Sequence, residues 1–340
     1  MRKEATLEQW RTLYEMATRI KELKPWKMLW NMDIIGIQYG EEKENTVYFS
    51  ILGRSGDCYG IVAYEDYEGF NGFWLLPAQT KMGLSTEYMM YCQKNLTCYW
   101  GDRKEVPEEQ RKIIEELGYS YHGKNQWLYF LSFVPGYAPY NMDEEEVLRM
   151  TEYLQDLELA LRAYEENGQS IDFVGGNMFL FKFSEDKENW SCGEAPLPFT
   201  KYYFNSPEIT DEQLYNDLAA VPKEDAILEA DIVMIGDCVD KEGEYERPAN
   251  HACAVLVETT SGTLVDCNIA EPEDDPLRRL AESIIGYCFE YGAPKEIRVS
   301  NAILEIGLKQ ICEVCGAKLC RVKRLSGVDK VVKKIERLGV

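Results

Sequence analysis

The sequence predicts two successive domains: an α+β domain with an antiparallel sheet, then an α/β domain whose elements run β-β-β-α-β-α-β-α. Three observations predict this division. The chain has 340 residues, more than an average single domain. Its first part contains short apolar segments between turns, and its last third alternates short apolar strands with helical patterns. We place residues 1–222 in the first domain, which is long enough for two subdomains, and residues 226–340 in the second.

The first domain is expected to open with an amphipathic helix. Thr6 and Gln9 form a capping-box pair, and apolar residues then recur at helical spacing until Pro25. Short strands separated by turns follow, as in an antiparallel meander, at residues 34–39, 47–52 and 59–64.

The remainder of this domain continues the α+β pattern. Helices are expected at residues 85–95, 107–117 and 143–166, the last on an apolar stripe from Val147 to Leu161. Strands are expected at residues 127–134, 178–183 and 199–204. Thr210 and Gln213 repeat the capping-box pair and begin a helix that ends near Ala220.

The second domain gives clearer signals. Its first strands are expected at residues 232–235, 253–257 and 264–269, with a hairpin turn at Ser261-Gly262. Asp275-Pro276 supplies an N-cap and a first-turn proline for a helix that ends at Gly292. A strand at 297–299, a helix at 302–315, a strand at 319–322 and a helix at 328–338 complete the order.

Composition and charge restrict the partners. The net charge of −22 opposes contact with phosphate backbones over most of the surface. Residues 318–340 differ, with eight basic residues against two acidic ones. A basic C-terminal helix of this kind binds nucleic acid or pairs with the protein's own acidic surface. The chain has no apolar run of membrane-spanning length and no apolar N-terminal signal, so we expect a cytoplasmic protein without membrane contact.

Aromatic residues are concentrated in the first domain. All seven tryptophans lie between Trp10 and Trp190. Exposed aromatic side chains at this density would mark a surface for a protein partner, because Trp and Tyr dominate interface hot spots. Packing in the interior is the alternative.

Short sequence motifs in the second domain resemble those of the catalytic core of integrases and DDE transposases. Ile235-Gly236-Asp237 matches a first strand that ends in Asp, and Gly292-Ala293-Pro294 matches a Gly-x-Pro before a short strand. The next family motif is Asp-Asn-Gly, where this chain has Ser300-Asn301-Ala302. The resemblance implies a ribonuclease H-like fold with a metal-binding Asp237, and with Glu336 or Asp329 as the carboxylate of the last helix.

Ser300 puts the chemistry of such a site in doubt. Two-metal phosphoryl transfer needs carboxylates that bridge and neutralise two cations, and a hydroxyl supplies neither the charge nor the bidentate reach. We therefore expect catalysis to be lost, with no cofactor. The alternative is a metal-dependent nuclease that uses Asp237 with Mg²⁺ or Mn²⁺, and Asp237 is otherwise an ordinary turn residue at a strand end.

The whole chain is also similar to an uncharacterised bacterial two-domain family. The matching residues and motifs span both halves of the chain: Trp10, Pro25-Trp26, the segment from Asp33 to Gln38, Pro135-Gly136-Tyr137 and Arg247-Pro248. This resemblance implies no known activity.

Histidine and cysteine motifs are weaker. His251 and Cys253 lie two residues apart on a strand, but a nucleophile also needs a base across it in space. Cys312 and Cys315 fall at the end of a helix, where the dipole does not activate a thiol, and with Cys288 and Cys320 they make a weak zinc pattern. We expect His251 and Cys253 to be a packed or edge-strand pair, and Cys312 and Cys315 to be core residues. The sequence thus favours a binding protein with a degenerate ribonuclease H-like domain over an enzyme.

Overall fold

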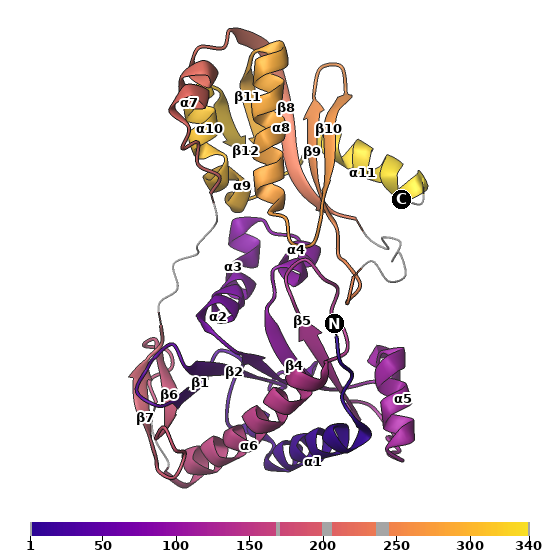
Figure 1. The fold of residues 1–340 in the computed structure, drawn as a ribbon, viewed down its shortest axis with the longest axis vertical. Helices are drawn as coiled ribbons and strands as arrows, with labels where there is room; N and C mark the ends of the chain where they lie inside the picture. Colours follow the sequence, from indigo (N-terminus) through magenta and orange to yellow (C-terminus); the bar gives the residue numbers. More distant parts are fainter. Residues whose placement is uncertain (1, 168–170, 199–205, 236–244, 339–340) are drawn as a thin grey trace. The chain divides into compact units, whose positions relative to one another are not determined.

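The chain divides into two compact units that interleave in sequence. A computed structural model describes residues 2–167, 171–198, 206–235 and 245–338 (Figure 1). Unit 1 comprises Met1–Phe73, Gln93–Val134 and Pro139–Lys201, and unit 2 comprises Trp74–Cys92, Pro135–Ala138 and Tyr202–Val340. The boundary predicted at residues 222–226 divides the chain at a single point, whereas two early segments here belong to unit 2. No change of composition in the sequence marks these segments.

Unit 1 is a seven-stranded sheet in the order β5-β4-β3-β2-β1-β6-β7. Its strands are β1 (Ile35–Tyr39), β2 (Thr46–Leu52), β3 (Tyr59–Tyr64), β4 (Asn95–Gly101), β5 (Trp127–Phe133), β6 (Asn177–Phe183) and β7 (Trp190–Pro196). Its helical segments are α1 (Leu7–Leu23), η1 (Pro25–Lys27), α2 (Tyr67–Phe73), η2 (Arg103–Glu105), α5 (Glu108–Glu116) and α6 (Glu144–Asn167).

The predicted meander is confirmed, because β1 pairs with β2 and β2 with β3 in antiparallel register. The prediction of a wholly antiparallel sheet is wrong at one place, since β1 and β6 are parallel. The long helix α6 precedes β6 and carries the chain back along the sheet, so β6 enters in the direction of β1. Strands β4 and β7 were not predicted, and the strand predicted at residues 199–204 lies outside the described residues.

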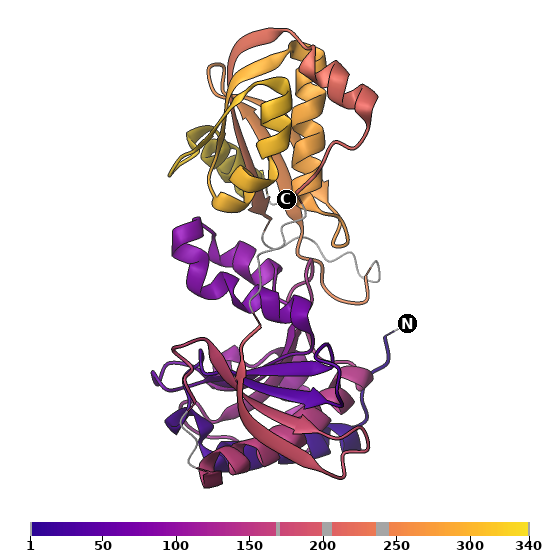
Figure 2. The ribbon, with the colours of Figure 1, turned by 90° about the vertical axis from the view of Figure 1, so that its left-hand side faces the viewer.

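Helices α1 and α6 lie side by side on one face of this sheet (Figure 2). The capping box of Thr6 and Gln9 begins α1 as predicted. The core between helices and sheet is rich in aromatic residues, including Trp10, Tyr14 and Phe130, whose rings contact one another. Interior packing therefore accounts for a large part of the aromatic content of this half.

Unit 2 is a five-stranded sheet in the order β10-β9-β8-β11-β12. Its strands are β8 (Lys223–Met234), β9 (Ala252–Glu258), β10 (Thr263–Ala270), β11 (Ala293–Val299) and β12 (Lys318–Arg321). Its helices are α3 (Leu75–Met82), α4 (Thr86–Tyr91), α7 (Glu212–Ala219), α8 (Pro276–Tyr291), α9 (Ala302–Gly307), α10 (Lys309–Cys315) and α11 (Ser326–Leu338). Strand β9 runs antiparallel to both of its neighbours, whereas β8, β11 and β12 are parallel.

The predicted element order of this part is confirmed, with three corrections. Strand β8 begins at Lys223, well before the predicted residue 232. The predicted helix at 302–315 is two helices that meet at Leu308, beside Gly307, where a Cβ atom would lie 2.5 Å from Leu277. The helix before the sheet is capped by Asp211, whose side chain accepts the Leu214 N–H, and the Thr210 pair does not begin it.

The sheet of unit 2 is covered differently on its two faces. On one face, β8 residues such as Leu228 and Ile232 pack in a core with α8, and α3 and α4 contribute Leu75, Met82 and Met89 to the same core. On the other face, α11 covers β8 and β9 through a smaller apolar cluster. Alternate residues of β8 therefore meet two different environments.

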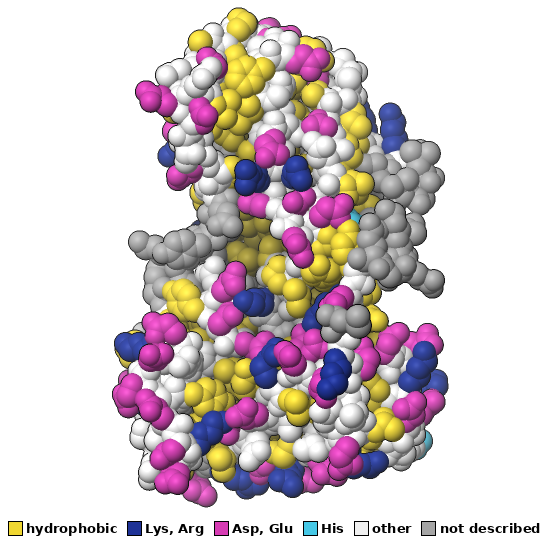
Figure 3. Space-filling view, viewed as in Figure 1, with side chains coloured by type: hydrophobic (Ala, Val, Ile, Leu, Met, Phe, Trp, Pro, Cys, Tyr) yellow, Lys and Arg dark blue, Asp and Glu magenta, His cyan; other side chains and the backbone are white. Residues whose placement is uncertain are grey.

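The surface of both units carries many acidic side chains, as the net charge requires (Figure 3). Among the described helices, none is both long and apolar enough to cross a membrane.

Candidate functional site

Three acidic side chains and one serine gather on the sheet face that α11 covers. Glu229 and Asp231 are two residues apart on β8, so both point to this face. Ser300 follows the last residue of β11, which pairs with β8, and Asp329 lies in the first turn of α11. We call Glu229, Asp231, Ser300 and Asp329 the carboxylate cluster.

Asp231 is hydrogen-bonded to Ser300. Ser300 Oγ donates to Asp231 Oδ1 at 2.8 Å, and the Ile232 N–H donates to the same oxygen at 3.0 Å. Burial, with a smaller effect from the charges of Asp329 and Glu229, raises the pKa of Asp231 to about 6 despite the lowering effect of these two hydrogen bonds.

Glu229 stabilises the start of α11. Its side chain is only 3% exposed, and its Oε2 accepts the backbone N–H groups of Gly327 at 2.6 Å and Val328 at 3.2 Å. A carboxylate in this position satisfies two free donors of the helix and favours its dipole. Gly327 permits the approach, because a Cβ there would lie 2.9 Å from Glu229 Oε2.

The remaining members of the cluster also have protein partners. Asp329 Oδ2 accepts from Arg324 Nε at 2.7 Å. Asn301 donates to Ser300 Oγ at 3.1 Å, while its own oxygen caps α9 by accepting from Ile303 and Leu304. Each side chain of the cluster thus has at least one hydrogen-bond partner within the protein.

This donor set does not match a two-metal centre. Within the described ranges, no group of three or more His, Cys, Asp or Glu side chains is arranged to hold a metal ion. Ser300 contributes a hydroxyl and no charge, and Glu229 accepts from two backbone N–H groups at the start of α11. Its chemistry is that of a polar network that joins β8, β11 and α11.

Of the three acids that the sequence predicted for the site, the structure places one in the carboxylate cluster. Asp237 lies outside the described residues. Glu336 falls in the last turns of α11, where only the backbone is described, and Asp329 does belong to the cluster. Asp231 and Glu229 were missed because the strand was expected to start at residue 232. Their signal was an i, i+2 acidic pair inside an otherwise apolar run.

The other candidate motifs are mostly core residues. Cys312 and Cys315 are buried, as expected, and Cys288 lies in the same core. Cys253 is buried with its Sγ 2.8 Å from that of Cys267, and His251 contacts Tyr245 and the Ala270 carbonyl. Asp275 caps α8, which confirms that role for the end of the acidic run at residues 271–275.

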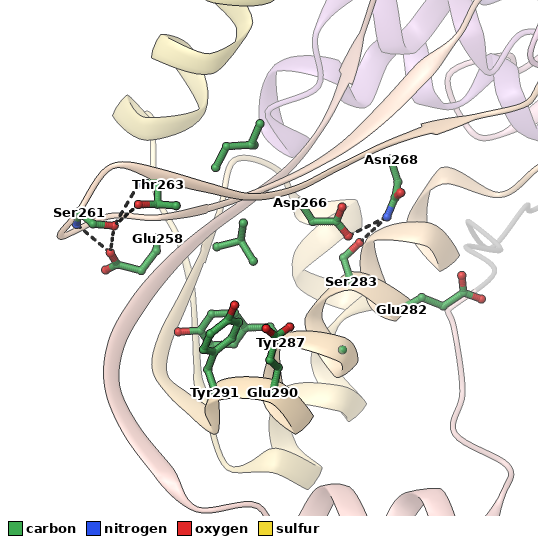
Figure 4. Close-up of a pocket in the computed structure, with 13 residues that line it drawn as sticks. Glu258, Ser261, Thr263, Asp266, Asn268, Glu282, Ser283, Tyr287, Glu290 and Tyr291 are labelled. Carbon is green, nitrogen blue, oxygen red and sulfur yellow. Dashed lines mark hydrogen bonds between the residues drawn. The ribbon is translucent and has the colours of Figure 1, made fainter.

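A second feature of unit 2 is a pocket of about 640 Å³ between the β9–β10 hairpin and α8 (Figure 4). Four acidic side chains line it: Glu258, Asp266, Glu282 and Glu290. Tyr287 and Tyr291 of α8 form part of its wall, with ring centroids 5.0 Å apart. We call this feature the acidic pocket.

Hydrogen bonds hold two of these acids in place. Ser261 and Thr260 donate their N–H groups to Glu258 at 2.7 and 2.8 Å, and with the Ser261 hydroxyl they lower the pKa of Glu258 to about 2. Asn268 donates to Asp266 Oδ2 at 2.7 Å and to Ser283 Oγ at 3.1 Å. The pocket thus keeps a fixed negative charge on the hairpin side.

Comparison with known families gives two matches. The family model of the domain of unknown function DUF7309 matches residues 10–182. The model of a second domain of unknown function, DUF6930, matches residues 214–336. A search of curated proteins finds no match.

Among solved structures, the chain is weakly similar to several retroviral integrases. The magnesium complex of the HTLV-2 integrase catalytic core shares 16% identity over 33% of this chain and 67% of that one, with a TM-score of 0.25. The BIV integrase core shares 14% identity over 33% and 64%, with a TM-score of 0.24. A chain of the simian T-cell lymphotropic virus intasome, in complex with a PP2A regulatory subunit, shares 14% over 33% and 40%, with a TM-score of 0.25. This chain thus spans less than half of the intasome chain, and similarity at this level does not establish a shared activity.

Proposed function

The chain belongs to the family of the domain of unknown function DUF7309, and from that premise we propose that it works by binding rather than by catalysis. In this proposal unit 2 is a degenerate ribonuclease H-like scaffold, and the protein acts in the cytoplasm. The element order and the central place of β8 in a mixed sheet support the fold assignment.

One observation carries the proposal: the hydroxyl of Ser300 donates to Asp231 where two-metal chemistry would need a second carboxylate. Two neighbouring cations need several formal negative charges around them, but Asp231 accepts from Ser300, and the charge of Asp329 is paired with Arg324. Glu229 is nearly inaccessible to solvent, and it accepts from two backbone N–H groups of α11. The proposal is therefore a site whose side chains hold the fold together.

The test is Mn²⁺ titration by calorimetry, with parallel cleavage assays on single-stranded and duplex DNA. The wild type is expected to bind no Mn²⁺ through Asp231 and to cleave neither substrate. Asp231→Asn keeps the oxygen that accepts from Ser300, so it removes the charge with little change of shape. Asp237→Ala examines the acid named by the integrase resemblance, and Glu115→Gln on the exposed side of α5 is the charge-matched control.

Mn²⁺ binding that Asp231→Asn or Asp237→Ala abolishes, while Glu115→Gln retains it, would contradict the proposal. Such a result, with cleavage, would favour the metal-dependent nuclease. A Ser300→Asp variant sharpens the test. If the cluster is a degenerate metal site, the added carboxylate should create Mn²⁺ binding that the wild type lacks.

Two surfaces support a macromolecular partner. In unit 1, Trp30 and Trp190 are about half exposed, and Arg54 stacks on Trp30 at 4.7 Å, which suits a protein partner. In unit 2, Lys330, Lys333 and Lys334 are exposed on α11, which supports nucleic-acid binding without cleavage as a second candidate. That candidate requires affinity that falls with added salt and is lost when the three lysines become Glu.

A further inference from the structure

The acidic pocket has the features of a binding site for a positively charged organic group. We propose that it binds an alkylammonium or guanidinium group. This inference goes beyond the proposed function, because it rests on the pocket alone and holds whether or not the carboxylate cluster binds metal. The volume of the acidic pocket, about 640 Å³, lies in the range of ordinary small-molecule sites.

The acids of the pocket have charge that the protein does not neutralise. Among the described residues, Glu258, Asp266 and Glu290 form no ion pair, and no Lys or Arg lines the pocket. Glu282 differs, since Arg278 and Arg279 approach it at 3.3 and 3.6 Å. Three carboxylates facing one cavity repel each other and any anion, and a cation relieves that repulsion.

The tyrosines favour an organic cation over a bare metal ion. Their rings lie 5.0 Å apart at an interplanar angle of 37°, and Tyr291 is 54% exposed. Burial and neighbouring carboxylates raise the pKa of Tyr287 to about 12, and a hydrogen bond with Glu290 raises that of Tyr291, so both rings stay neutral phenols. Neutral aromatic faces attract ammonium and guanidinium groups, and they also cover the apolar part of such ligands.

Gly286 keeps the pocket open. It lines the cavity from the middle of α8, and a Cβ atom built there would have no neighbour within 4 Å. Close packing therefore does not require a glycine at this position. A glycine inside a helix also makes the helix less stable than an alanine would. A larger side chain at this position would enter the cavity.

The experiment is calorimetric titration of the full chain with two probes. Agmatine carries a guanidinium and an ammonium as a free small molecule, and the peptide acetyl-Gly-Arg-Gly-amide presents a guanidinium as a protein would. Acetyl-Gly-Gln-Gly-amide is the uncharged control. Binding of agmatine alone would assign a small-molecule ligand, and binding of the arginine peptide would assign a protein side chain. Saturable binding of neither charged probe up to about 10 mM would overturn the proposal.

Variants distinguish the pocket from the acidic surface as a whole. Tyr291→Leu and Glu290→Gln, both at exposed positions, are expected to weaken binding by about threefold to tenfold each. Gly286→Leu should abolish it by filling the cavity, and far-UV circular dichroism establishes that the variant folds. Glu115→Gln on unit 1 removes the same charge and should leave binding unchanged. Equal binding by the wild type and all three pocket variants would show that diffuse surface charge holds the cation and would overturn the proposal.

Discussion

Unit 2 contains two groups of acidic side chains that differ in what surrounds them. In the carboxylate cluster, Glu229 accepts from the backbone of α11, Asp231 from Ser300, and Asp329 from Arg324. In the acidic pocket, the donors to Glu258 and Asp266 among the described residues are neutral groups of their own hairpin, and Glu290 faces the cavity with the tyrosines. The residue types are the same, but the first group is satisfied inside the fold and the second is open to a ligand.

The difference shows that a carboxylate's role follows from its partners more than from its position in a motif. The cluster includes Ser300 and Asp329, two residues that the integrase resemblance named, yet its side chains are engaged in joining elements. The pocket has no motif at all, because its acids come from two strands and a helix. Four substitutions and one control would sharpen or break this contrast.

The largest effect is expected for Glu229→Ala. It removes the acceptor of two backbone N–H groups in a buried place, and we expect a loss of about 3 kcal/mol in the free energy of unfolding of unit 2. Urea unfolding followed by far-UV circular dichroism measures it. Tryptophan fluorescence is an internal control, since every tryptophan except Trp74 lies in unit 1. Stability equal to that of the wild type would mean that Glu229 is not structural, and the contrast would fail.

Asp231→Asn is expected to stabilise unit 2 by about 2 kcal/mol at pH 7.5. Because burial raises the pKa of Asp231 to about 6, the folded state binds more protons than the unfolded state between about pH 4 and 6. Stability from this group is therefore full below pH 4 and is lost as the pH rises through 6. The variant lacks this loss, so its advantage should vanish near pH 4.

The control for that variant is Asp225→Asn on the same strand. Lys295 lowers the pKa of Asp225, so this substitution should not stabilise the protein at pH 7.5. If both variants stabilise the protein, the cause is relief of its overall negative charge and not the burial of Asp231. If neither does, Asp231 is better solvated than its surroundings indicate, and its pKa is not raised.

The smallest effects are expected from a pair of glycines, one in each region. Gly327→Ala should cost about 1–2 kcal/mol, because its Cβ would lie 2.9 Å from both Glu229 and Val257. Gly286→Ala should add about 0.5–1 kcal/mol, since its Cβ meets nothing in the pocket. Thermal unfolding of the two variants side by side measures the difference. The same sign for both would mean that the two regions are packed alike.

The sequence predicted most helices and strands but fewer of the residues that matter. Capping boxes and periodicity located α1, and Asp275-Pro276 located α8, since these are local signals. Strand β8 was shortened because charged residues at its start, Lys223 to Asp225, resemble a turn, and that error concealed Asp231. Ser300 was identified from its motif, but only the pairing of β11 with β8 shows that its hydroxyl reaches an acid.

The acidic pocket and the interleaving of the units had no local signal. Glu258, Asp266 and Glu290 are dispersed along the chain, and only the hairpin's path over α8 brings them to one cavity. Helices α3 and α4 follow helix α2 of unit 1 without a linker and precede strand β4 of the same unit, so their apolar faces looked like part of the first domain. Both features depend on tertiary packing, which periodicity does not encode.

That interleaving has a consequence for synthesis on the ribosome. Helix α4 emerges about 130 residues before β8, which at about 5–20 residues per second leaves Leu75, Met82 and Met89 without their core partners for on the order of ten seconds. Unit 1 has all its strands once Pro196 has been made. The nascent chain is therefore expected to complete unit 1 first. Until the C-terminal strands are made, residues 74–92 remain an exposed apolar segment that a chaperone would protect.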